Sequence, residues 1–258
     1  MRTDGVSILI PNWNHELVLP RALRSALAAA DELARHGLGC ETVVVDDGSR
    51  DGSLVLLRQA EALYADRGLR VVAHGRNRGL AQARATGMAA AGYRYAVWLD
   101  ADNEVEPANV PLFYRAIRDT RAAVVFGNLV IHEPDRIDMV SHESFGVRMF
   151  ETNHIDTFSL CDLQQWFDAQ AVYLGDHSPQ EDWERWLHLA TGGRTLVHVP
   201  VVIGYYYRNP GSYVADHTAG LATIKKLGRV YRQFPAVRDR FPLATKHLRY
   251  HPDVGWLN

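Results

Sequence analysis

Four carboxylates fall within seven residues in the segment VWLDADNEVEP (97–107): Asp100, Asp102, Glu104 and Glu106. Carboxylates this close repel one another and resist burial. In an extended segment alternate side chains share a face, so Asp100 and Asp102 can reach one point. A hard divalent cation, Mg²⁺ or Mn²⁺, would relieve their repulsion and leave positions open for substrate phosphates. We therefore predict a metal site at Asp100 and Asp102; the alternative is a solvated acidic turn that caps the next helix.

The other two acids fit that alternative. Glu104 and Glu106 come just before Pro107, where the next helix pattern begins, and acidic residues favour helix N-termini. We predict that both belong to the helix start.

A second acidic block, DDGSRDGS, occupies residues 46–53 after a β-branched run. Asp-Gly-Ser is typical of turns, and Asp51 or Ser53 can cap the following helix. Two adjacent acids at a strand end exceed what a turn needs, and a carboxylate there can accept the N–H of a nucleobase. We predict that role for Asp47 and leave Asp46 open between a structural role and ligand binding.

The elements that must position these acids follow from hydrophobic periodicity. Strand-like runs alternate with helix patterns, which predicts right-handed βαβ units, a mostly parallel sheet and the α/β class. The predicted strands are 6–10, 42–45, 69–73, 95–99 and 123–127, and the predicted helices are one that begins near Pro20, 52–67, 79–91 and 107–119. Such sheets bind ligands at the carboxyl ends of their strands, so residues 10–15, 46–53, 75–79 and 100–107 should converge on one edge.

The second half of the chain is less regular. Residues 130–177 lack periodicity, which predicts a loop-rich, substrate-facing part. A helix is expected over 178–193, followed by an extended segment at 195–208 with a bend or edge at Pro200. An amphipathic helix at 217–233 carries Lys225, Lys226, Arg229 and Arg232 and is either a solvated basic face or a contact to an anionic membrane.

Composition narrows the class of protein. The chain has 258 residues, 22% of them charged, and a formal net charge of −2, so we expect no nucleic-acid partner. Cys40 and Cys161 have no metal-ligand spacing and are expected to be free thiols.

No signal peptide and no apolar run of about 20 residues is visible, so we expect a cytoplasmic protein. The first loop lacks G-x-G-x-x-G, and the chain has no P-loop, H-E-x-x-H, C-x-x-C or G-x-S-x-G motif.

Five segments in order resemble the successive blocks of bacterial-type family 2 glycosyltransferases with the GT-A fold. They extend from about residue 5 to residue 213 and read VSILIPNWNHELVLPRALRSAL, ETVVVDDGSRDGS, NRGLAQARATGMAAAG, YAVWLDADNEVEP and EDWERWLHLA. The resemblance implies a Rossmann-like sheet flanked by helices, with a donor half at 1–128, an acceptor and catalytic-base half at 129–215 and a helical tail at 216–258. It also implies a UDP-, GDP- or dTDP-sugar donor, Mn²⁺ or Mg²⁺, and inversion at the anomeric carbon.

The resemblance also assigns residues. Pro11 and Trp13 match positions that line the nucleoside pocket, Asp47 the base-reading carboxylate, and Asp100-Ala101-Asp102 the D-x-D motif, with Asp102 on the metal. Arg84 matches a helix position that supports the diphosphate or the acid cluster. The donor-binding set is Pro11, Trp13, Asn14, Asp46, Asp47, Asn77, Gly79, Arg84, Asp100, Ala101 and Asp102.

The Glu181-Asp182 pair aligns with the block that supplies the catalytic base. Ser178, Pro179 and Glu181 have the form of a capping box, and Glu181 can also pair with Arg185 at i,i+4. Asp182 has no such structural duty. We predict Asp182 as the general base and keep Glu181 as the alternative.

The late segment YYYRNPGSY departs from the family pattern, with Asn209 where His is common, and Ala85-Thr86 follow Arg84 where Arg-Asn is common. Acceptor contacts are assigned to Trp183, Arg208 and Ser212, and His217 is a candidate to complete the metal site. Trp166 and Trp183 either stack on a sugar or pack in the core.

The Gln-x-x-Arg-Trp signature of processive synthases is absent. The expected function is therefore transfer of one sugar to a small-molecule, glycan or lipid-linked acceptor. The alternatives are a degenerate nucleotide-sugar-binding module and a sugar nucleotidyltransferase, although the latter would want a Gly-rich basic first loop.

Overall fold

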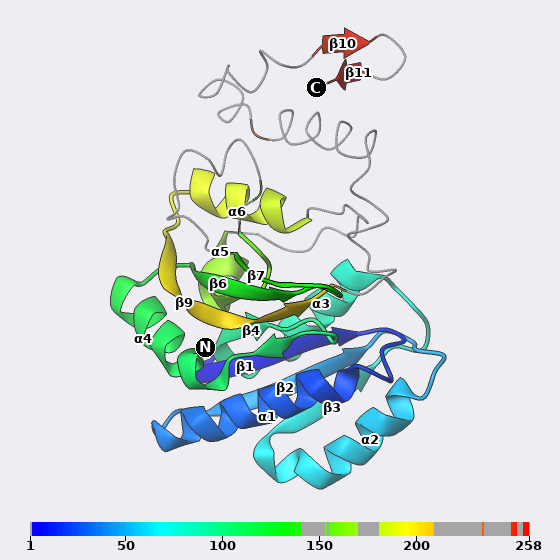
Figure 1. Ribbon diagram of the computed structural model, residues 1–258. Coiled ribbons are helices and arrows are strands. Elements are labelled where there is room, and N and C mark those ends of the chain that lie inside the picture. Colours follow the sequence, from blue (N-terminus) through cyan, green and yellow to red (C-terminus); the bar gives the residue numbers. More distant parts are fainter. Residues whose placement is uncertain are drawn as a thin grey trace.

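A mixed β-sheet with helices on both faces forms the body of the computed structural model (Figure 1). The structure describes residues 2–140, 153, 155–169, 181–208, 234, 249–251 and 255–257. The strands of the sheet are β1 (Thr3–Asn12), β2 (Cys40–Asp46), β3 (Leu69–Ala73), β4 (Tyr93–Trp98), β5 (Glu104–Val105), β6 (Val124–His132), β7 (Ile137–Val140), β8 (Ser159–Asp162) and β9 (Leu196–Tyr207). The helices are α1 (Leu19–Arg35), α2 (Ser53–Tyr64), α3 (Leu80–Ala90), α4 (Val110–Thr120), α5 (Leu163–Asp168) and α6 (Glu181–Thr191), with short 3₁₀ turns η1 (Ala65–Arg67) and η2 (Pro107–Asn109).

The first half of the sheet is parallel. Its strand order is β3-β2-β1-β4, and each neighbouring pair is parallel. The crossovers are α1, α2 and α3, which confirms the predicted βαβ units. All four strands therefore end at one edge, where the predicted ligand-binding segments follow them.

The second half of the sheet contains antiparallel strands. β8 pairs antiparallel with both β4 and β6, while β9 is parallel to β6 and β5 is antiparallel to β9. The expectation of a loop-rich segment at 130–177 was wrong where β7, β8 and α5 form. β8 is only four residues long, too short for a periodic signal, and its two sheet neighbours stabilise it. Pro200 lies where the β6–β9 register shifts, as expected for a residue without an N–H.

Of the two acids predicted to belong to the helix start before Pro107, one needs correction. Glu104 does not begin a helix: it forms β5 with Val105 and pairs with Tyr205 of β9. Glu106 does cap a helical turn, because its side chain accepts a hydrogen bond from the Ala108 N–H at the start of η2.

The N-cap of α2 also differs from the prediction. Gly52 occupies the cap position, without a side-chain bond. Asp51 accepts from Ser53 N at 3.0 Å, whereas Ser53 Oγ accepts from His15 N at 3.2 Å. Ser53 therefore connects α2 to the loop after β1.

The alternation of side chains along β1 produces two apolar cores. Ile8 and Ile10 face the core formed with α1, α2 and α4, while Leu9 faces the core formed with α3, α5 and α6. This follows from the two-residue period of a strand. The second core holds Trp98, Trp166, Trp183 and Trp186, all buried.

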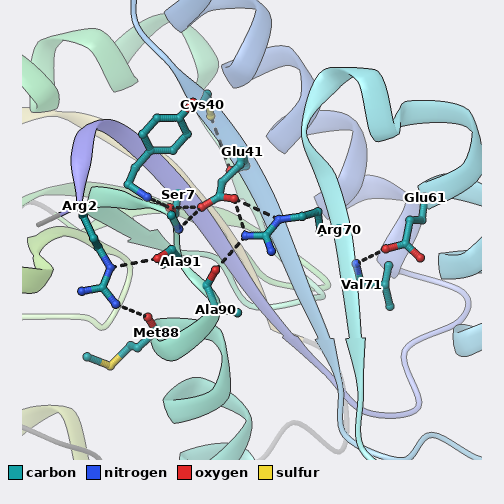
Figure 2. Close-up of polar contacts among 12 residues, drawn as sticks. Arg2, Ser7, Cys40, Glu41, Glu61, Arg70, Val71, Met88, Ala90 and Ala91 are labelled. Atoms are coloured by element: carbon teal, nitrogen blue, oxygen red, sulfur yellow. Dashed lines mark hydrogen bonds and ion pairs between the residues drawn. The ribbon is translucent and has the colours of Figure 1, made fainter.

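A buried carboxylate joins the amino ends of the central strands (Figure 2). Glu41 on β2 accepts hydrogen bonds from Ser7 Oγ at 2.6 Å, Gly92 N at 2.5 Å and Arg70 Nη2 at 2.6 Å. Burial alone would raise the pKa of Glu41, but these hydrogen bonds outweigh burial and lower it. The charged form of Glu41 therefore stabilises the fold.

Two arginines cap the C-terminus of α3 at the same place (Figure 2). Arg70 donates to the Ala90 carbonyl at 2.8 Å, and Arg2 donates to the carbonyls of Ala91 and Met88 at 2.9 and 3.1 Å. These groups satisfy orphan carbonyls and complement the helix dipole. They hold α3 against the sheet at the end opposite the predicted ligand-binding edge.

Within the part of the chain that the structure describes, every helix is too short or too polar to span a bilayer. The predicted basic helix at 217–233 lies outside the described residues.

Candidate active site

The D-x-D segment follows β4 directly. Ala101 is buried, which leaves the carboxylates of Asp100 and Asp102 at the edge of the sheet. Arg84 of α3 is 5% exposed and donates to Asp100 Oδ1 at 3.1 Å. The structure therefore brings Arg84 to the acid pair, in agreement with one of its two expected roles.

Burial and the charge of Asp100 raise the pKa of Asp102, while His15 and Arg21 oppose the shift. Two hard carboxylates that repel each other at a sheet edge fit a divalent cation such as Mg²⁺ or Mn²⁺. Among the described residues, no cluster of three or more His, Cys, Asp and Glu side chains is arranged as a metal cage. Among the described residues the candidate donor set is therefore these two carboxylates, and such a set would leave coordination positions for substrate oxygens. His217 lies outside the described residues.

The loop after β1 is attached to the turn after β2. Pro11 is buried at the end of β1, and Trp13 is 48% exposed. Asn14 has a positive φ of 57°, donates its N–H to Ser49 Oγ at 2.9 Å and accepts from Arg50 N at 2.7 Å. Trp13 therefore projects from a well-connected loop at the carboxyl edge, where the resemblance places the nucleoside.

Asp46 is fully buried within this pair of loops. Its carboxylate accepts from Asn12 Nδ2 at 2.9 Å and from Ser49 N at 3.1 Å. These contacts favour the structural role of the two that the sequence left open.

Asp47 anchors the loop after β3. Its Oδ1 lies 2.6 Å from His74 Nδ1 and accepts from Arg78 N at 2.9 Å, and its Oδ2 accepts from Gly79 N at 2.8 Å. Asn77 Oδ1 also accepts from Gly79 N, at 3.1 Å. Asp47 is buried, with 1% of the residue exposed, and a contact between its carboxylate and a nucleobase stays a prediction.

The two loops also pack closely through their backbones. Gly48 has φ +70°, and a Cβ there would lie 2.4 Å from the carbonyl carbon of Arg76. A side chain at position 48 would push the two loops apart, so glycine is required both by its φ and by this approach.

Asp182 lies in the first turn of α6 and is half-buried. Its Oδ2 accepts from Asn153 Nδ2 at 3.0 Å, and its Oδ1 accepts from Trp183 N at 2.9 Å. Glu181 begins α6, but its side chain lies outside the described part, as does Ser178. Trp183 is 2% exposed and packs in the core, the alternative to sugar stacking, and Trp166 does the same.

Asp156 is a further carboxylate that the sequence did not single out. It is half-buried just before β8, and its Oδ1 accepts from Phe158 N at 2.8 Å. The pKa of Asp156 is raised to about 7, mainly by burial. The Phe158 N–H and Arg84 act to lower it, whereas the charges of Asp182 and Asp100 act to raise it. Asp156 therefore lies within electrostatic reach of both the D-x-D segment and the predicted base. Because β8 runs antiparallel to β4, its start lies at the carboxyl edge of β4.

Tyr206 of β9 belongs to the same acidic region. Burial raises the pKa of its phenol, and the charges of Asp156, Asp100 and Asp102 raise it further. No sequence pattern singles out Tyr206, which lies in a run of three tyrosines.

The predicted acceptor residues are only partly described. Arg208 donates from its Nη1 to Glu133 Oε1 at 2.6 Å, and its backbone N–H donates to the His132 carbonyl at 2.9 Å. Ser212 lies outside the described residues.

A surface hollow of about 440 Å³ lies elsewhere. Its lining includes Asp4, Arg94, Arg118 and Asp162, and it contains none of the predicted site residues. The acidic edge therefore remains the candidate site.

Sequence comparison identifies related proteins of known family. The family model described as glycosyl transferase family 2 matches residues 7–172. The succinoglycan biosynthesis protein ExoO of Rhizobium meliloti is 28% identical over 177 residues, which cover 69% of this chain and 46% of that protein. The undecaprenyl-phosphate 4-deoxy-4-formamido-L-arabinose transferase of Pseudomonas aeruginosa is 40% identical over 108 residues, or 42% of this chain and 31% of that protein. The chain thus spans less than half the length of these curated relatives.

Solved structures share the fold. S. aureus TarS 1-349 in complex with UDP-GlcNAc superposes with a TM-score of 0.71 at 16% identity, over 90% of this chain and 66% of that chain. The mannosyltransferase PcManGT of Pyrobaculum calidifontis, in complex with GDP-Man and Mn²⁺, superposes with a TM-score of 0.65 at 16% identity, over 94% and 69%. Together with the family match, these likenesses confirm the predicted GT-A fold. The chain belongs to glycosyl transferase family 2.

Proposed function

We propose that this chain transfers a single sugar from a nucleoside-diphosphate sugar to an acceptor hydroxyl, with inversion and with Asp182 as the general base. The observation that carries the proposal is that Asn153 bonds Asp182 to the segment just before β8, and β8 runs antiparallel beside β4, whose carboxyl end leads into Asp100 and Asp102. Membership of the family supports sugar transfer as the reaction class.

Asp100 and Asp102 are the residues that would hold Mn²⁺ or Mg²⁺. Bound there, the cation would neutralise the charge that develops on the leaving diphosphate. The PcManGT complex with GDP-Man and Mn²⁺ and the TarS complex with UDP-GlcNAc support a nucleotide-sugar donor and a divalent cation. Arg84, buried beside Asp100, adds a fixed positive charge on the donor side.

One base suffices because a nucleoside diphosphate is a good leaving group. Asp182 accepts the proton of the acceptor hydroxyl, and that oxygen attacks the anomeric carbon opposite the diphosphate. Asn153 holds one oxygen of Asp182 and so orients the carboxylate. A general base of this kind accounts for roughly 10²–10⁴ in rate.

The acceptor is proposed as a glycan, a lipid-linked molecule or another small molecule. Relatives named for undecaprenyl-phosphate and for succinoglycan biosynthesis support the first two. We propose a cytoplasmic protein that meets a lipid-linked acceptor at the inner face of the membrane through its basic segment at 217–233.

A product-release assay tests this function. Protein, Mn²⁺ and a candidate donor such as UDP-GlcNAc or GDP-Man are mixed with and without candidate acceptors, and released nucleoside diphosphate is measured. A transferase releases diphosphate faster with acceptor, whereas a degenerate module binds donor without release. A nucleotidyltransferase instead releases pyrophosphate from a nucleoside triphosphate and a sugar phosphate. Either of the last two results would refute the proposal.

A further inference from the structure

Arg21 in the first turn of α1 reaches the D-x-D segment from the opposite side to Arg84. Its Nη2 donates to the backbone carbonyl of Asp102 at 2.5 Å, and its Nε lies 3.5 Å from Glu104 Oε1. The side chain of Arg21 is 24% exposed, so most of this contact is shielded from solvent. One guanidinium thus contacts both ends of the segment 102–104.

The same guanidinium lies over the ring of Tyr207, with its central carbon 3.5 Å from the ring centroid. Tyr207 donates its backbone N–H to Asn103 Oδ1 at 3.0 Å and its hydroxyl to Glu104 at 3.3 Å. Arg21 and Tyr207 together therefore contact each residue of 102–104. We call this set (Arg21, Asn103, Glu104 and Tyr207) the clasp.

Regular secondary structure holds the two side chains of the clasp that contact the segment 102–104. Tyr207 is the last residue of β9, and its ring stacks on that of His132, with centroids 4.5 Å apart and an interplanar angle of 18°. His132 is its partner in the parallel β6–β9 ladder. The position of Tyr207 is therefore set by two strands, and Arg21 is set by a helix.

An ordinary surface ion pair does not account for these contacts. The Arg21–Glu104 pair alone, partly exposed and 3.5 Å long, would contribute little. Arg21 also satisfies a backbone carbonyl and stacks on an aromatic ring, which uses the planar fork of arginine and could not be reproduced by lysine. The combination restrains backbone position, not only charge.

We propose that Arg21 is a positioning residue for the cation and donor site, which acts by fixing the backbone of Asp102 through the clasp. This inference rests on the proposed function, because Asp102 is the proposed metal ligand. Arg21 does not touch the substrate in this account. Its loss lets the segment 102–104 move, and the carboxylate of Asp102 moves with it relative to that of Asp100.

The test measures Mn²⁺ binding directly, by the electron paramagnetic resonance signal of free Mn²⁺ in the presence of UDP or GDP. Arg21→Ala is compared with Arg24→Ala, which removes an exposed arginine from the same helix. We expect Arg21→Ala to bind Mn²⁺ about 10- to 100-fold more weakly, the usual effect of losing a supporting residue outside the ligand shell. Arg24→Ala should match the wild type.

Two further variants separate positioning from charge and from general stability. Arg21→Lys keeps the charge and should still bind Mn²⁺ weakly. Tyr207→Phe keeps the ring and should stay close to the wild type, whereas Tyr207→Leu removes the stack and should resemble Arg21→Ala. Should Arg21→Ala fail to fold, which thermal unfolding in EDTA would reveal, the two Tyr207 variants decide the question in the same assay.

The results of these binding measurements can refute the positioning role of Arg21 separately from the proposed function. Wild-type Mn²⁺ affinity in Arg21→Ala or in Tyr207→Leu would overturn the clasp and leave the proposed function intact. Absence of Mn²⁺ binding by the wild-type protein, with either nucleotide, would overturn the proposed metal site and the clasp with it.

Discussion

Asn153 Nδ2 donates a 3.0 Å hydrogen bond to Asp182 Oδ2, which joins the segment before β8 to the first turn of α6. The other carboxylate oxygen accepts from Trp183 N. The carboxylate is thereby held in one orientation by partners on both oxygens. Such a contact matters for a general base, whose efficiency depends on geometry as well as on pKa.

Replacement of Asn153 by Ala should slow transfer without abolishing it. We expect about a tenfold fall in kcat, with a smaller change in KM for the donor, because the base loses orientation and not its charge. Steady-state release of nucleoside diphosphate checks this. An unchanged kcat in a folded Asn153→Ala would refute the positioning role.

Replacement of Asp156 by Asn should stabilise the metal-free protein more at pH 8 than at pH 5. Burial and then nearby acids raise the pKa of Asp156 from 3.8 to about 7, so its ionisation costs folding free energy as pH rises through that window. Above about pH 7 the full cost is present, and the neutral amide removes it. Thermal unfolding in EDTA should show a gain of about 2–4 °C at pH 8, the effect of roughly 1 kcal/mol in a chain of this size.

Asp51→Asn provides the control of opposite sign. Although burial raises the pKa of Asp51, hydrogen bonds from Ser53 and from the Glu16 N–H outweigh it and lower the pKa. Its stabilising contribution is present above the pKa of the unfolded chain and is lost as pH falls through the lower folded value. Asp51→Asn should therefore lower the melting temperature at pH 8. An equal gain for Asp156→Asn at pH 5 and pH 8 would contradict the account.

Replacement of Glu41 by Gln should destabilise the fold without touching the site. It leaves Arg70 beside a neutral partner and weakens the bonds to Ser7 and Gly92, at an expected cost of about 2–3 kcal/mol. Chemical denaturation measures this, and Glu32→Gln, in a surface pair with Arg35, should cost less than about 1 kcal/mol. Nucleotide affinity of the folded Glu41→Gln should match the wild type. A loss of affinity would show that the amino ends of the strands influence the site.

Replacement of Asp102 by Ala should separate stability from binding. Burial and the Asp100 charge raise the pKa of Asp102, so its removal relieves repulsion and should raise the melting temperature in EDTA at neutral pH. The same variant should lose most of the Mn²⁺-dependent affinity for UDP or GDP, measured by calorimetry. Glu106→Ala is the matched control, because Glu106 caps η2 and bonds Tyr205, and it should retain that affinity. Wild-type metal-dependent binding by Asp102→Ala would exclude Asp102 as a ligand.

The parallel half of the fold could be predicted because its strands are apolar runs separated by periodic helices. β8 could not, since Ser159–Asp162 gains its strand conformation from two neighbours rather than from its own pattern. The strand at Glu104 could not be predicted either. Acidic residues before a proline favour a helix start, but pairing of Glu104 with Tyr205 of β9 overrides that local preference.

The acids at the strand ends could also be predicted, because ligand sites in such sheets lie at the carboxyl edge. The place of Asp156 in the candidate site could not be predicted, because it depends on the pairing of β8 with β4. The contact between Arg21 and Tyr207 could not be predicted either, because it joins two residues that are far apart in sequence and meet only in the folded chain. The prediction of Asp182 over Glu181 depends on the helix-cap pattern at 178–181, most of which lies outside the described residues.

The measurement that tests the central claim most directly compares Asp182→Asn with the wild type in a transfer assay. Both proteins are checked for matching thermal unfolding and for matching Mn²⁺-dependent binding of nucleoside diphosphate. We expect acceptor-dependent release of diphosphate to fall by roughly 10²–10⁴ in Asp182→Asn while binding is retained. A folded Asp182→Asn that transfers sugar at the wild-type rate would contradict this claim.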